Sequence, residues 1–337
     1  MGRRQSKHKI LLLLDVLQDP PASQDFGEIL KQEDWKPEAR LIKALTSLGH
    51  EVKPFGLFND IRPLFEEIQT NRPDLVFNQC EAFNGDRDNE PNIPALLELL
   101  NVKYTGASAH ALSVCKDKAL TKKILSYHRI RVPRFVVSKK SRPIRKLHGF
   151  KYPAFTKPLN LESSEGIAQM SFTENEKDTL DRVKFLHESL KCDVIIEEYI
   201  EGREIYVGIL GNEKLKILPP RELFFREVPE GEPKFATFKA KWDDNYRKKW
   251  GIKSGAARAF LPKTEKNLFE TCRKIYKLFN IKGFARIDLR LTEAGEVVFI
   301  EANPNPSIAF DEDFALAAEK ADMPYEMLLA QILSLAI

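Results

Sequence analysis

The sequence predicts a mixed α/β fold, in which an N-terminal parallel α/β domain precedes two α+β units. The first observation is that strand and helix patterns alternate in the first third of the chain, with short turns marked by Gly and Pro. The second is that this regular alternation stops after residue 117. The third is size, since 337 residues, 43% of them hydrophobic, supply two to three domains of about 100–200 residues each.

In the first third, strands are expected at residues 10–17, 51–55 and 75–78, and helices at residues 37–48, 62–69 and 94–100. The repeated strand–helix–strand order predicts a parallel sheet with helices on its faces. No G-x-G-x-x-G follows the first strand, so a dinucleotide site is not supported. Residues 18–35 are polar and irregular, and we interpret them as a loop or a flexible lid.

The rest of the chain predicts two α+β units. The first has helices at residues 117–128 and 175–189 and strands at residues 135–137, 152–157 and 193–200. The second has a strand at 204–210, a charged and aromatic stretch to about residue 255, a helix at 265–280, strands at 284–291 and 296–302, and a helix at 324–335. The expected domain limits are therefore 1–117, 118–204 and 205–337.

Composition excludes several classes of protein. With 53 Lys and Arg against 49 Asp and Glu, the net charge of +4 is too small for a dedicated nucleic-acid binder. No segment approaches the roughly 20 apolar residues of a membrane helix, and the apolar run near the N-terminus is broken at Asp15 with no cleavage site after it. No C-x-x-C pair or disulfide framework is formed by Cys80, Cys115, Cys192 and Cys272. We expect a cytoplasmic protein that binds neither nucleic acid nor a membrane.

The strongest local signal is a pair of carboxylates on a predicted hairpin. Side chains two apart share a strand face, so Arg286 and Asp288 lie on one face and Glu301 and Asn303 on one face of the next strand. If residues 294–295 are the centre of a two-residue turn, Asp288 lies opposite Glu301. Their Cβ atoms would then be roughly 4.5–5.5 Å apart.

Two facing carboxylates repel each other unless a cation or a proton lies between them. Mg²⁺ prefers such oxygen ligands and commonly joins carboxylates to substrate phosphates. Arg286 on the same face can hold a phosphoryl or carboxylate oxygen. A solvent-exposed hairpin face with surface ion pairs explains the pattern equally well. The irregular segment 304–307, Pro-Asn-Pro-Ser, favours a site.

Two further segments contain groups suited to a nucleotide. Lys157 ends a predicted strand before the polar loop 160–166, whose backbone amides can bind phosphate, although the order is not that of a P-loop. An ordinary surface loop is the alternative. Glu197, Glu198 and Glu204 lie near strand ends and can bind ribose hydroxyls or an adenine amine, unless the segment is a solvated turn.

Taken in order, these segments resemble the ATP-grasp superfamily, and within it the D-alanine–D-alanine ligase group, from near Asp74 to the end of the chain. The resemblance is carried by Asp117-Lys118 with Thr121-Lys122, Thr156-Lys157-Pro158, Ser163-Ser164-Glu165-Gly166-Ile167, Glu197-Glu198-Tyr199-Ile200, Gly202-Arg203-Glu204, Phe238-Lys239-Ala240-Lys241-Trp242, Arg286-Ile287-Asp288 and Glu301-Ala302-Asn303. It implies an N-terminal parallel α/β domain (the preATP-grasp domain) and two α+β subdomains that sandwich ATP.

The resemblance also implies a role for each matching residue. The implied nucleotide ligands are Lys118 and Lys157 for the α- and β-phosphates, Lys241 for the γ-phosphate, Glu197 for the adenine amine, the backbone of Glu198 and Ile200 for the adenine edge, and Glu204 for the ribose. Ser163 and Ser164 belong to the loop implied to close over the phosphates. The implied ligands of two Mg²⁺ ions, with Mn²⁺ as an alternative metal, are Asp288, Glu301 and Asn303. Arg286 is implied to stabilise the transferred phosphoryl group and the later tetrahedral intermediate.

The implied activity is ATP-dependent joining of an amino acid or peptide carboxylate to an amine, through an acylphosphate, with release of ADP and phosphate. The alternatives are a non-catalytic ATP-binding protein and a kinase on the same fold. Related ligases often pair through their N-terminal domain, so a homodimer is one outcome that the resemblance allows.

The sequence departs from this group where amino-acid substrates are expected to bind. The usual glycine-serine-glutamate segment for the first D-alanine is absent around residues 15–25, and Gln79-Cys80-Glu81 stands where a His-Gly pair is common. Trp242 replaces a tyrosine, and residues 304–307 replace a threonine-x-proline-glycine-methionine segment. The ATP half is therefore kept, whereas D-alanine is not predicted as the substrate.

Overall fold

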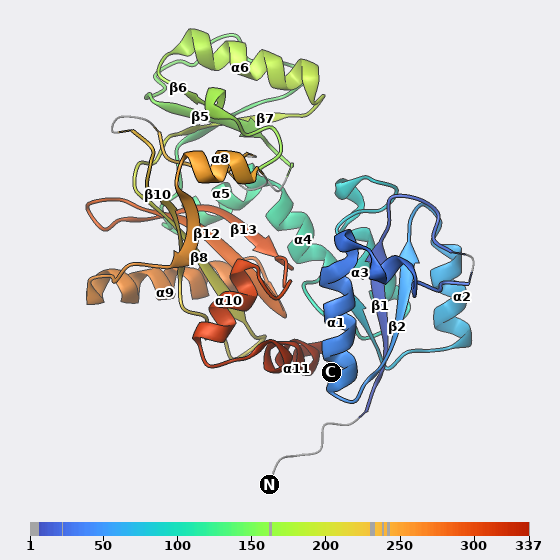
Figure 1. Cartoon of the computed structure of the whole chain (residues 1–337). Helices are drawn as coiled ribbons and strands as arrows, with labels where there is room; N and C mark the ends of the chain where they lie inside the picture. Colours follow the sequence, from blue (N-terminus) through green and yellow to red (C-terminus); the bar gives the residue numbers. More distant parts are fainter. Residues whose placement is uncertain are drawn as a thin grey trace.

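Three β-sheets organise the part of the chain that the computed structural model describes, which comprises residues 7–21, 23–161, 164–229, 233–237, 239–240 and 243–336. Figure 1 shows them as three lobes, with the N-terminal lobe beside the C-terminal one and the middle lobe above the C-terminal one. The structure confirms the mixed α/β class, with one parallel and two antiparallel sheets.

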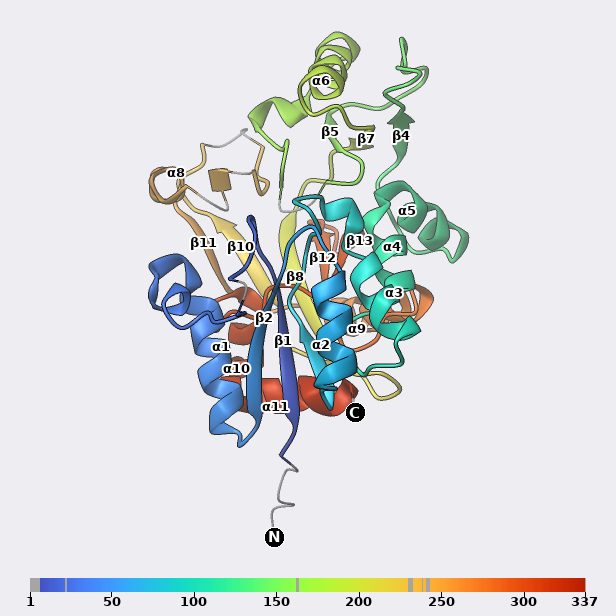
Figure 2. The ribbon, with the colours of Figure 1, turned by 90° about the vertical axis from the view of Figure 1, so that its right-hand side faces the viewer.

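The N-terminal sheet has the order β2-β1-β3 and is parallel, as predicted. Its elements are β1 (Lys9–Asp15), α1 (Lys36–Ser47), β2 (Glu51–Leu57), α2 (Arg62–Thr70), β3 (Leu75–Asn78) and α3 (Asn92–Leu99). Alternate side chains of β1 pack on α1 and, from the other face, on α2 and α3, which lie on opposite sides of the sheet in Figure 2. The predicted first strand is two residues too long, because Leu17 leaves the sheet and is 89% exposed.

The middle sheet is antiparallel, with the order β4-β7-β5-β6, and α6 packs on it (Figure 1). Its elements are β4 (Phe135–Ser138), β5 (Ala154–Pro158), β6 (Phe172–Thr173), α6 (Glu176–Ser189) and β7 (Val194–Glu198). Each predicted strand and the helix are present, with ends that differ by one or two residues. Lys157 of β5 and Glu197 of β7 share one face of this sheet, because Phe155 pairs with Glu197 and Lys157 with Ile195. Both residues line a cavity that the third sheet also borders.

The third sheet has the order β11-β10-β8-β12-β13, with β9 paired to β8. Its elements are β8 (Arg203–Leu210), β9 (Lys216–Ile217), β10 (Arg221–Phe225), α8 (Asp244–Lys249), β11 (Ile252–Ala256), α9 (Pro262–Leu278), β12 (Phe284–Leu291), β13 (Val297–Pro304), α10 (Asp313–Lys320) and α11 (Tyr325–Ala336). The sequence analysis did not predict β9, β10, β11, α8 or α10.

Two helices between the first and second sheets pack on the third one. These are α4 (Ala109–Lys116), which the sequence analysis missed, and α5 (Lys118–Tyr127). α4 contacts β13, and α5 contacts α9, within one hydrophobic core that includes strands β8, β12 and β13. α11 returns to pack on α1 near the N-terminal sheet (Figure 1). The domain limits 1–117, 118–204 and 205–337 stay predictions.

The hairpin of β12 and β13 pairs Asp288 with Glu301, as predicted, but not for the predicted reason. The turn is not a two-residue turn, because the N–H of Thr292 donates to the carbonyl of Glu296 at 3.0 Å, which leaves three residues in the loop. This shifts the register by one residue near the turn. Ile300 then forms a β-bulge, since Leu289 pairs with Phe299 and Asp288 with Glu301. The bulge restores the pairing of the two carboxylates.

The predictions about disulfides and membrane helices can be compared with the structure. All four cysteines are free thiols, and burial raises the pKa of the Cys80 and Cys272 thiols. In the described part of the chain, no helix combines the length and the hydropathy that crossing a bilayer demands.

Candidate active site

A cavity lies between the middle sheet and the third sheet, and most of the predicted nucleotide residues surround it. Its walls come from β5, β7, β8, β12 and β13 together with the loop that contains Ser164. The lining includes Phe155, Lys157, Ser164, Glu197, Glu198, Tyr199, Ile200, Glu204, Tyr206, Phe235, Asp288, Arg290, Ile300 and Glu301. Segments distant in sequence therefore meet in one place, with the carboxylates of the hairpin at one side and Lys157 with Glu197 at another.

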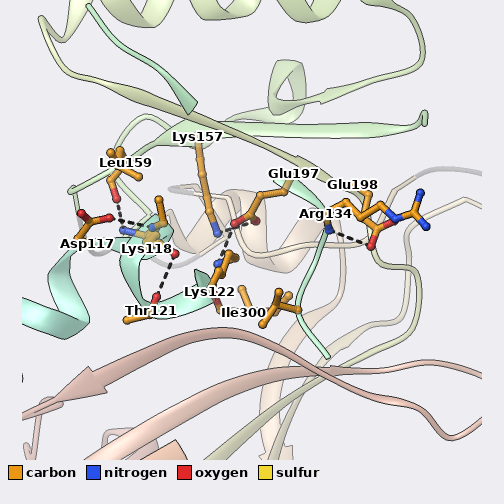
Figure 3. A network of polar contacts seen from close by, with 12 residues as sticks. Asp117, Lys118, Thr121, Lys122, Arg134, Lys157, Leu159, Glu197, Glu198 and Ile300 are labelled. Atoms are coloured by element: carbon orange, nitrogen blue, oxygen red, sulfur yellow. Dashed lines mark hydrogen bonds and ion pairs between the residues drawn. The ribbon is translucent and has the colours of Figure 1, made fainter. Parts of the chain in front are cut away.

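A buried charge cluster occupies the side formed by the middle sheet (Figure 3). Glu197 is 2% exposed, and its two oxygens each face an ammonium group: Oε1 lies 2.8 Å from Lys122 Nζ, and Oε2 lies 3.1 Å from Lys157 Nζ. Lys157 and Lys122 are themselves 3% and 0% exposed. The interpretations of Lys157 as part of a surface loop and of Glu197 as part of a solvated turn are therefore wrong.

The charges of this cluster are mutually dependent. Burial works against the charged form of Glu197, but the neighbouring Lys122 and Lys157 outweigh it, so the pKa of Glu197 is lowered. Burial also disfavours the Lys157 ammonium, yet Glu197 and Glu301 raise the pKa of that lysine. For Lys122 burial dominates and lowers the pKa to about 8. An isolated buried charge would be costly here, so the three groups hold one another in their ionised forms.

Lys118 and Lys122 lie one turn apart on α5. Asp117 caps this helix by accepting from the N–H groups of Ala119 and Leu120, which fixes where the helix begins. Lys118 Nζ donates to the carbonyl of Leu161 at 2.5 Å, at the start of the loop that follows β5. Sequence reasoning assigned no role to Lys122, although its spacing of four residues from Lys118 places both on one helix face.

The loop that follows β5 is described in part. Ser164 lines the cavity in a left-handed conformation with φ +62°, and its carbonyl accepts from the N–H of Ile167 at 2.9 Å. Ser163 and Lys241, both predicted site residues, lie outside the described residues, as does Trp242.

The side of the cavity next to β7 is suited to a planar base. Aromatic rings line it. Phe155 packs edge-on against Phe235 with the ring centroids 4.8 Å apart, and Tyr199 lies beside them. The N–H of Glu198 donates to the carbonyl of Arg134 at 2.8 Å, so only the carbonyl of Glu198 remains as a backbone group for a base edge. The Glu198 side chain is turned to Arg131 and the N–H of Arg134. Ile200 lines the cavity just after β7 ends.

Glu204 is held by two residues that sequence reasoning missed. The hydroxyl of Tyr206 donates to Glu204 Oε1 at 2.7 Å, and Arg290 Nη2 lies 3.3 Å from Oε2. Arg290 also donates to the carbonyl of Gly202 at 2.9 Å and is 6% exposed. The alternation of β12 places Arg290 on the face of Arg286 and Asp288, and this signal was available in the sequence.

The hairpin brings the four predicted residues of the metal side together. Arg286 donates to both oxygens of Asp288, at 2.7 and 2.9 Å, and Asn303 Nδ2 donates to Asp288 Oδ2 at 3.0 Å. Asp288 is 6% exposed and lies opposite Glu301. The Asp288 carboxylate with Glu301 and a neighbouring amide is an oxygen donor set that fits Mg²⁺ completed by phosphate and water. Among the described residues, no group of three or more His, Cys, Asp or Glu is placed to hold a metal by itself.

Two larger cavities adjoin this site on its N-terminal side, with volumes of about 640 and 1080 Å³. The first opens at the carboxyl end of β1, and both are lined by Glu81, Asn305 and Ser307. Arg286, Glu301 and Asn303 border the second. The segments in which the sequence departs from the D-alanine–D-alanine ligase group thus converge on the space next to the predicted catalytic residues.

Comparison with known proteins identifies the family. Residues 120–334 match the family model described as "D-ala D-ala ligase C-terminus". A D-alanine–D-alanine ligase from Aquifex aeolicus is 30% identical over 298 residues, which covers 87% of this chain and 91% of that protein. One from Pseudothermotoga lettingae is 28% identical and covers 98% of this chain and 99% of that protein.

Solved structures show the same fold. A D-alanine–D-alanine ligase from Bacillus anthracis complexed with ATP superposes with a TM-score of 0.72 at 20% identity, covering 98% of this chain and 97% of that one. VanG D-Ala:D-Ser ligase from Enterococcus faecalis superposes with a TM-score of 0.69 at 18% identity, covering 98% of this chain and 100% of that one. With the family model spanning more than half of the sequence, the chain belongs to the D-alanine–D-alanine ligase family of ATP-grasp, carbon–nitrogen bond-forming ligases.

Proposed function

We propose that this chain uses ATP to join the carboxylate of an amino acid or peptide to an amine. The observation that carries the proposal is the cavity with Glu197 and Lys157 on one side and Asp288 with Glu301 on another. One side offers a carboxylate for a base amine and a cation for phosphate, and the other offers oxygen ligands for a metal. A purely structural cavity does not require both sets.

The proposed reaction has two steps. A carboxylate oxygen of the first substrate attacks the γ-phosphorus of ATP, the bond to the bridging oxygen breaks, and ADP leaves with an acylphosphate formed. The amine nitrogen of the second substrate then attacks the acyl carbon, phosphate leaves, and the nitrogen loses a proton to give an amide. Phosphorylation is needed because a carboxylate oxygen is a poor leaving group.

Charge stabilisation is the main contribution of the protein. Lys118 and Lys157 are proposed to bind the α- and β-phosphates, and Arg286 to neutralise the transferred phosphoryl group. Lys241 and Ser164 complete the proposed phosphate contacts. Mg²⁺ on Asp288, Glu301 and Asn303 would supply Lewis-acid charge stabilisation. Glu204 and the backbone of Glu198 and Ile200 are proposed for ribose and adenine.

The amino-acid substrates are proposed only by class. The relatives carry the names of D-alanine–D-alanine and D-alanine–D-serine ligases, so D-alanine and D-serine belong in any first test. The cavity of about 640 Å³ next to Asp15 and Gln79 has room for larger amino acids and for dipeptides. Among the described residues, its lining contains Asp15, Asp19, Asp34, Glu38 and Glu81 and no Lys or Arg, which suits substrates that bear an ammonium group.

The proposal is tested by screening D- and L-amino acids and dipeptides for phosphate release with Mg·ATP, with hydroxylamine to trap an acylphosphate. Ligation predicts equal amounts of ADP, phosphate and amide, and a hydroxamate when hydroxylamine replaces the amine. ADP without free phosphate would show a kinase instead. ATP binding without turnover on any substrate would favour a non-catalytic binding protein.

A further inference from the structure

We propose that Lys122 is a positioning residue that joins the adenine-binding Glu197 to the β-bulge beside the metal-binding Glu301. This inference rests on the proposed function for the identity of the nucleotide. It assigns Lys122 no contact with ATP. Its role is to hold in place two groups that ATP and metal would contact from opposite sides of the cavity.

The geometry of Lys122 is that of a fixed cross-link. Its ammonium is 0% exposed, lies 2.8 Å from Glu197 Oε1 and donates to the carbonyl of Ile300 at 2.6 Å. The Phe299 ring covers it at 5.5 Å. Glu197 belongs to β7 of the middle sheet and Ile300 to β13 of the third, so one side chain from α5 connects both walls of the cavity (Figure 3).

The contact with Ile300 falls on the residue that forms the bulge. Ile300 is the one residue of β13 here that has no opposite on β12, because the pairs on either side are Phe299 with Leu289 and Glu301 with Asp288. A bulge disrupts the ladder locally. Lys122 donates to the bulge carbonyl in a part-buried contact, and a carbonyl shielded from water that loses its partner is costly. Lys122 therefore favours the backbone path that brings Glu301 opposite Asp288.

The two lysines on Glu197 have different surroundings. Lys157 lines the cavity and is the proposed phosphate ligand, whereas Lys122 does not line it. When a triphosphate enters, its oxygens compete with Glu197 Oε2 for Lys157. Lys122 remains on Oε1 because Ile300 and Phe299 enclose it. Oε2 then becomes available to accept from the adenine amine while the carboxylate keeps a counter-ion.

This division of roles predicts a base preference. The carboxylate of Glu197 attracts the amine of adenine and repels the carbonyl oxygen that hypoxanthine carries at the same position. Without Lys122, Glu197 loses the partner that fixes its orientation, and Lys157 has to remain as its only cation. Discrimination between ATP and ITP should then fall more than affinity for the triphosphate itself.

The test compares Lys122→Met with Lys123→Met, a neighbour on α5 that is exposed. The dissociation constants of Mg·ATP and Mg·ITP are measured by calorimetry for the full-length chain, so no amino-acid substrate is needed. We expect the wild type to bind ATP at least ~30-fold more tightly than ITP, since one charge-assisted hydrogen bond accounts for about 2 kcal/mol. The ratio should fall to about 5-fold or less in Lys122→Met and stay unchanged in Lys123→Met.

Two further comparisons keep the test decisive. If Lys122→Met does not fold, Lys122→Arg keeps the cation while changing its shape, and its ATP-to-ITP ratio should still fall at least threefold. A ratio within twofold of wild type in the folded variant overturns the inference and leaves the ligase proposal intact. A wild-type chain that binds neither nucleotide overturns both.

Discussion

Replacing Asp288 with asparagine tests both the proposed metal role and the structural role of this carboxylate. In the structure Asp288 accepts two hydrogen bonds from Arg286, at 2.7 and 2.9 Å, and one from Asn303 at 3.0 Å. Asparagine removes the charge and places an NH₂ group where one of the two oxygens accepted. One donor then faces another, and the Arg286 guanidinium loses its closest anion.

The cost to stability follows from these contacts. Breaking a buried ion pair by removing one partner costs about 3–5 kcal/mol, and the lower value applies because the Arg286 side chain is still 20% exposed. A loss of about 3 kcal/mol corresponds to a fall in Tm of roughly 4 °C, because a chain of 337 residues has an unfolding entropy of about 0.7 kcal/mol/K. Asp288→Asn should also lower ATP turnover at least ~100-fold, because charge on the transferred phosphoryl group is no longer neutralised by a correctly held metal.

The matched variant is Glu301→Gln. Glu301 lies opposite Asp288 but is half-buried, so we expect a comparable loss of turnover with a smaller fall in Tm. Melting is measured without nucleotide and metal, because ligands that bind the folded state raise Tm. A Tm of Asp288→Asn within about 1 °C of wild type would refute the ion pair with Arg286, since the pair's lower bound is several degrees. Near-normal turnover in both variants would refute the metal assignment.

Three other changes test separate parts of the site. Lys157→Ala should weaken Mg·ATP binding about 10-fold or more by calorimetry, and an unchanged affinity would remove this lysine from the phosphate site. Burial raises the pKa of the Asp15 carboxyl and outweighs the backbone N–H groups of Glu81 and Ala82, which lower it. The folded state therefore favours the protonated carboxyl, and stability is lost as the pH rises above the ordinary pKa of an aspartate. Asp15→Asn should therefore raise Tm at pH 7 but not at pH 3, and an equal gain at both would exclude this cause. Gly106→Ala should lower the free energy of unfolding by about 1–3 kcal/mol, because φ of Gly106 is +97° and a Cβ would lie 2.4 Å from Asn305 Oδ1. The displaced segment 304–307 should also raise the substrate KM. No change in either quantity would show that this segment tolerates displacement.

The parts of the fold that were predictable are those in which burial follows a simple period. β1, β3 and β12 are apolar or alternate regularly, and the sequence analysis found them within two residues. β10 was missed because it buries a charged residue that ion pairs stabilise. Glu222 is 1% exposed, and Arg203 and Arg258 both donate to it. A charged residue in the middle of a short strand resembles a loop until its partners, distant in sequence, are known.

The buried cluster of Glu197 shows the same limit within the site. Sequence alone placed Lys157 and Glu197 near strand ends, with an ordinary surface loop as the alternative for Lys157 and a solvated turn as the alternative for Glu197. Their function as a pair depends on Lys122, which comes from a helix 75 residues before Glu197 in the printed sequence. Local spacing does not contain that contact, because it is created when α5 packs between the two sheets.

The hairpin shows how a correct pairing can follow from an incomplete argument. Alternation along β12 and β13 determines which side chains share a face, and it was read correctly from the sequence. Register depends in addition on the turn, and the three-residue loop moved it by one residue, which would have turned Glu301 away from Asp288. The bulge at Ile300 moved it back. Because Ile300 has no opposite residue on β12, its carbonyl needs another donor. The donor is Lys122, which connects the bulge beside the proposed metal site with Glu197 of the middle sheet. The ATP-to-ITP comparison tests the Glu197 end of this connection, and the Asp288 and Glu301 variants test the carboxylate pair that the bulge aligns.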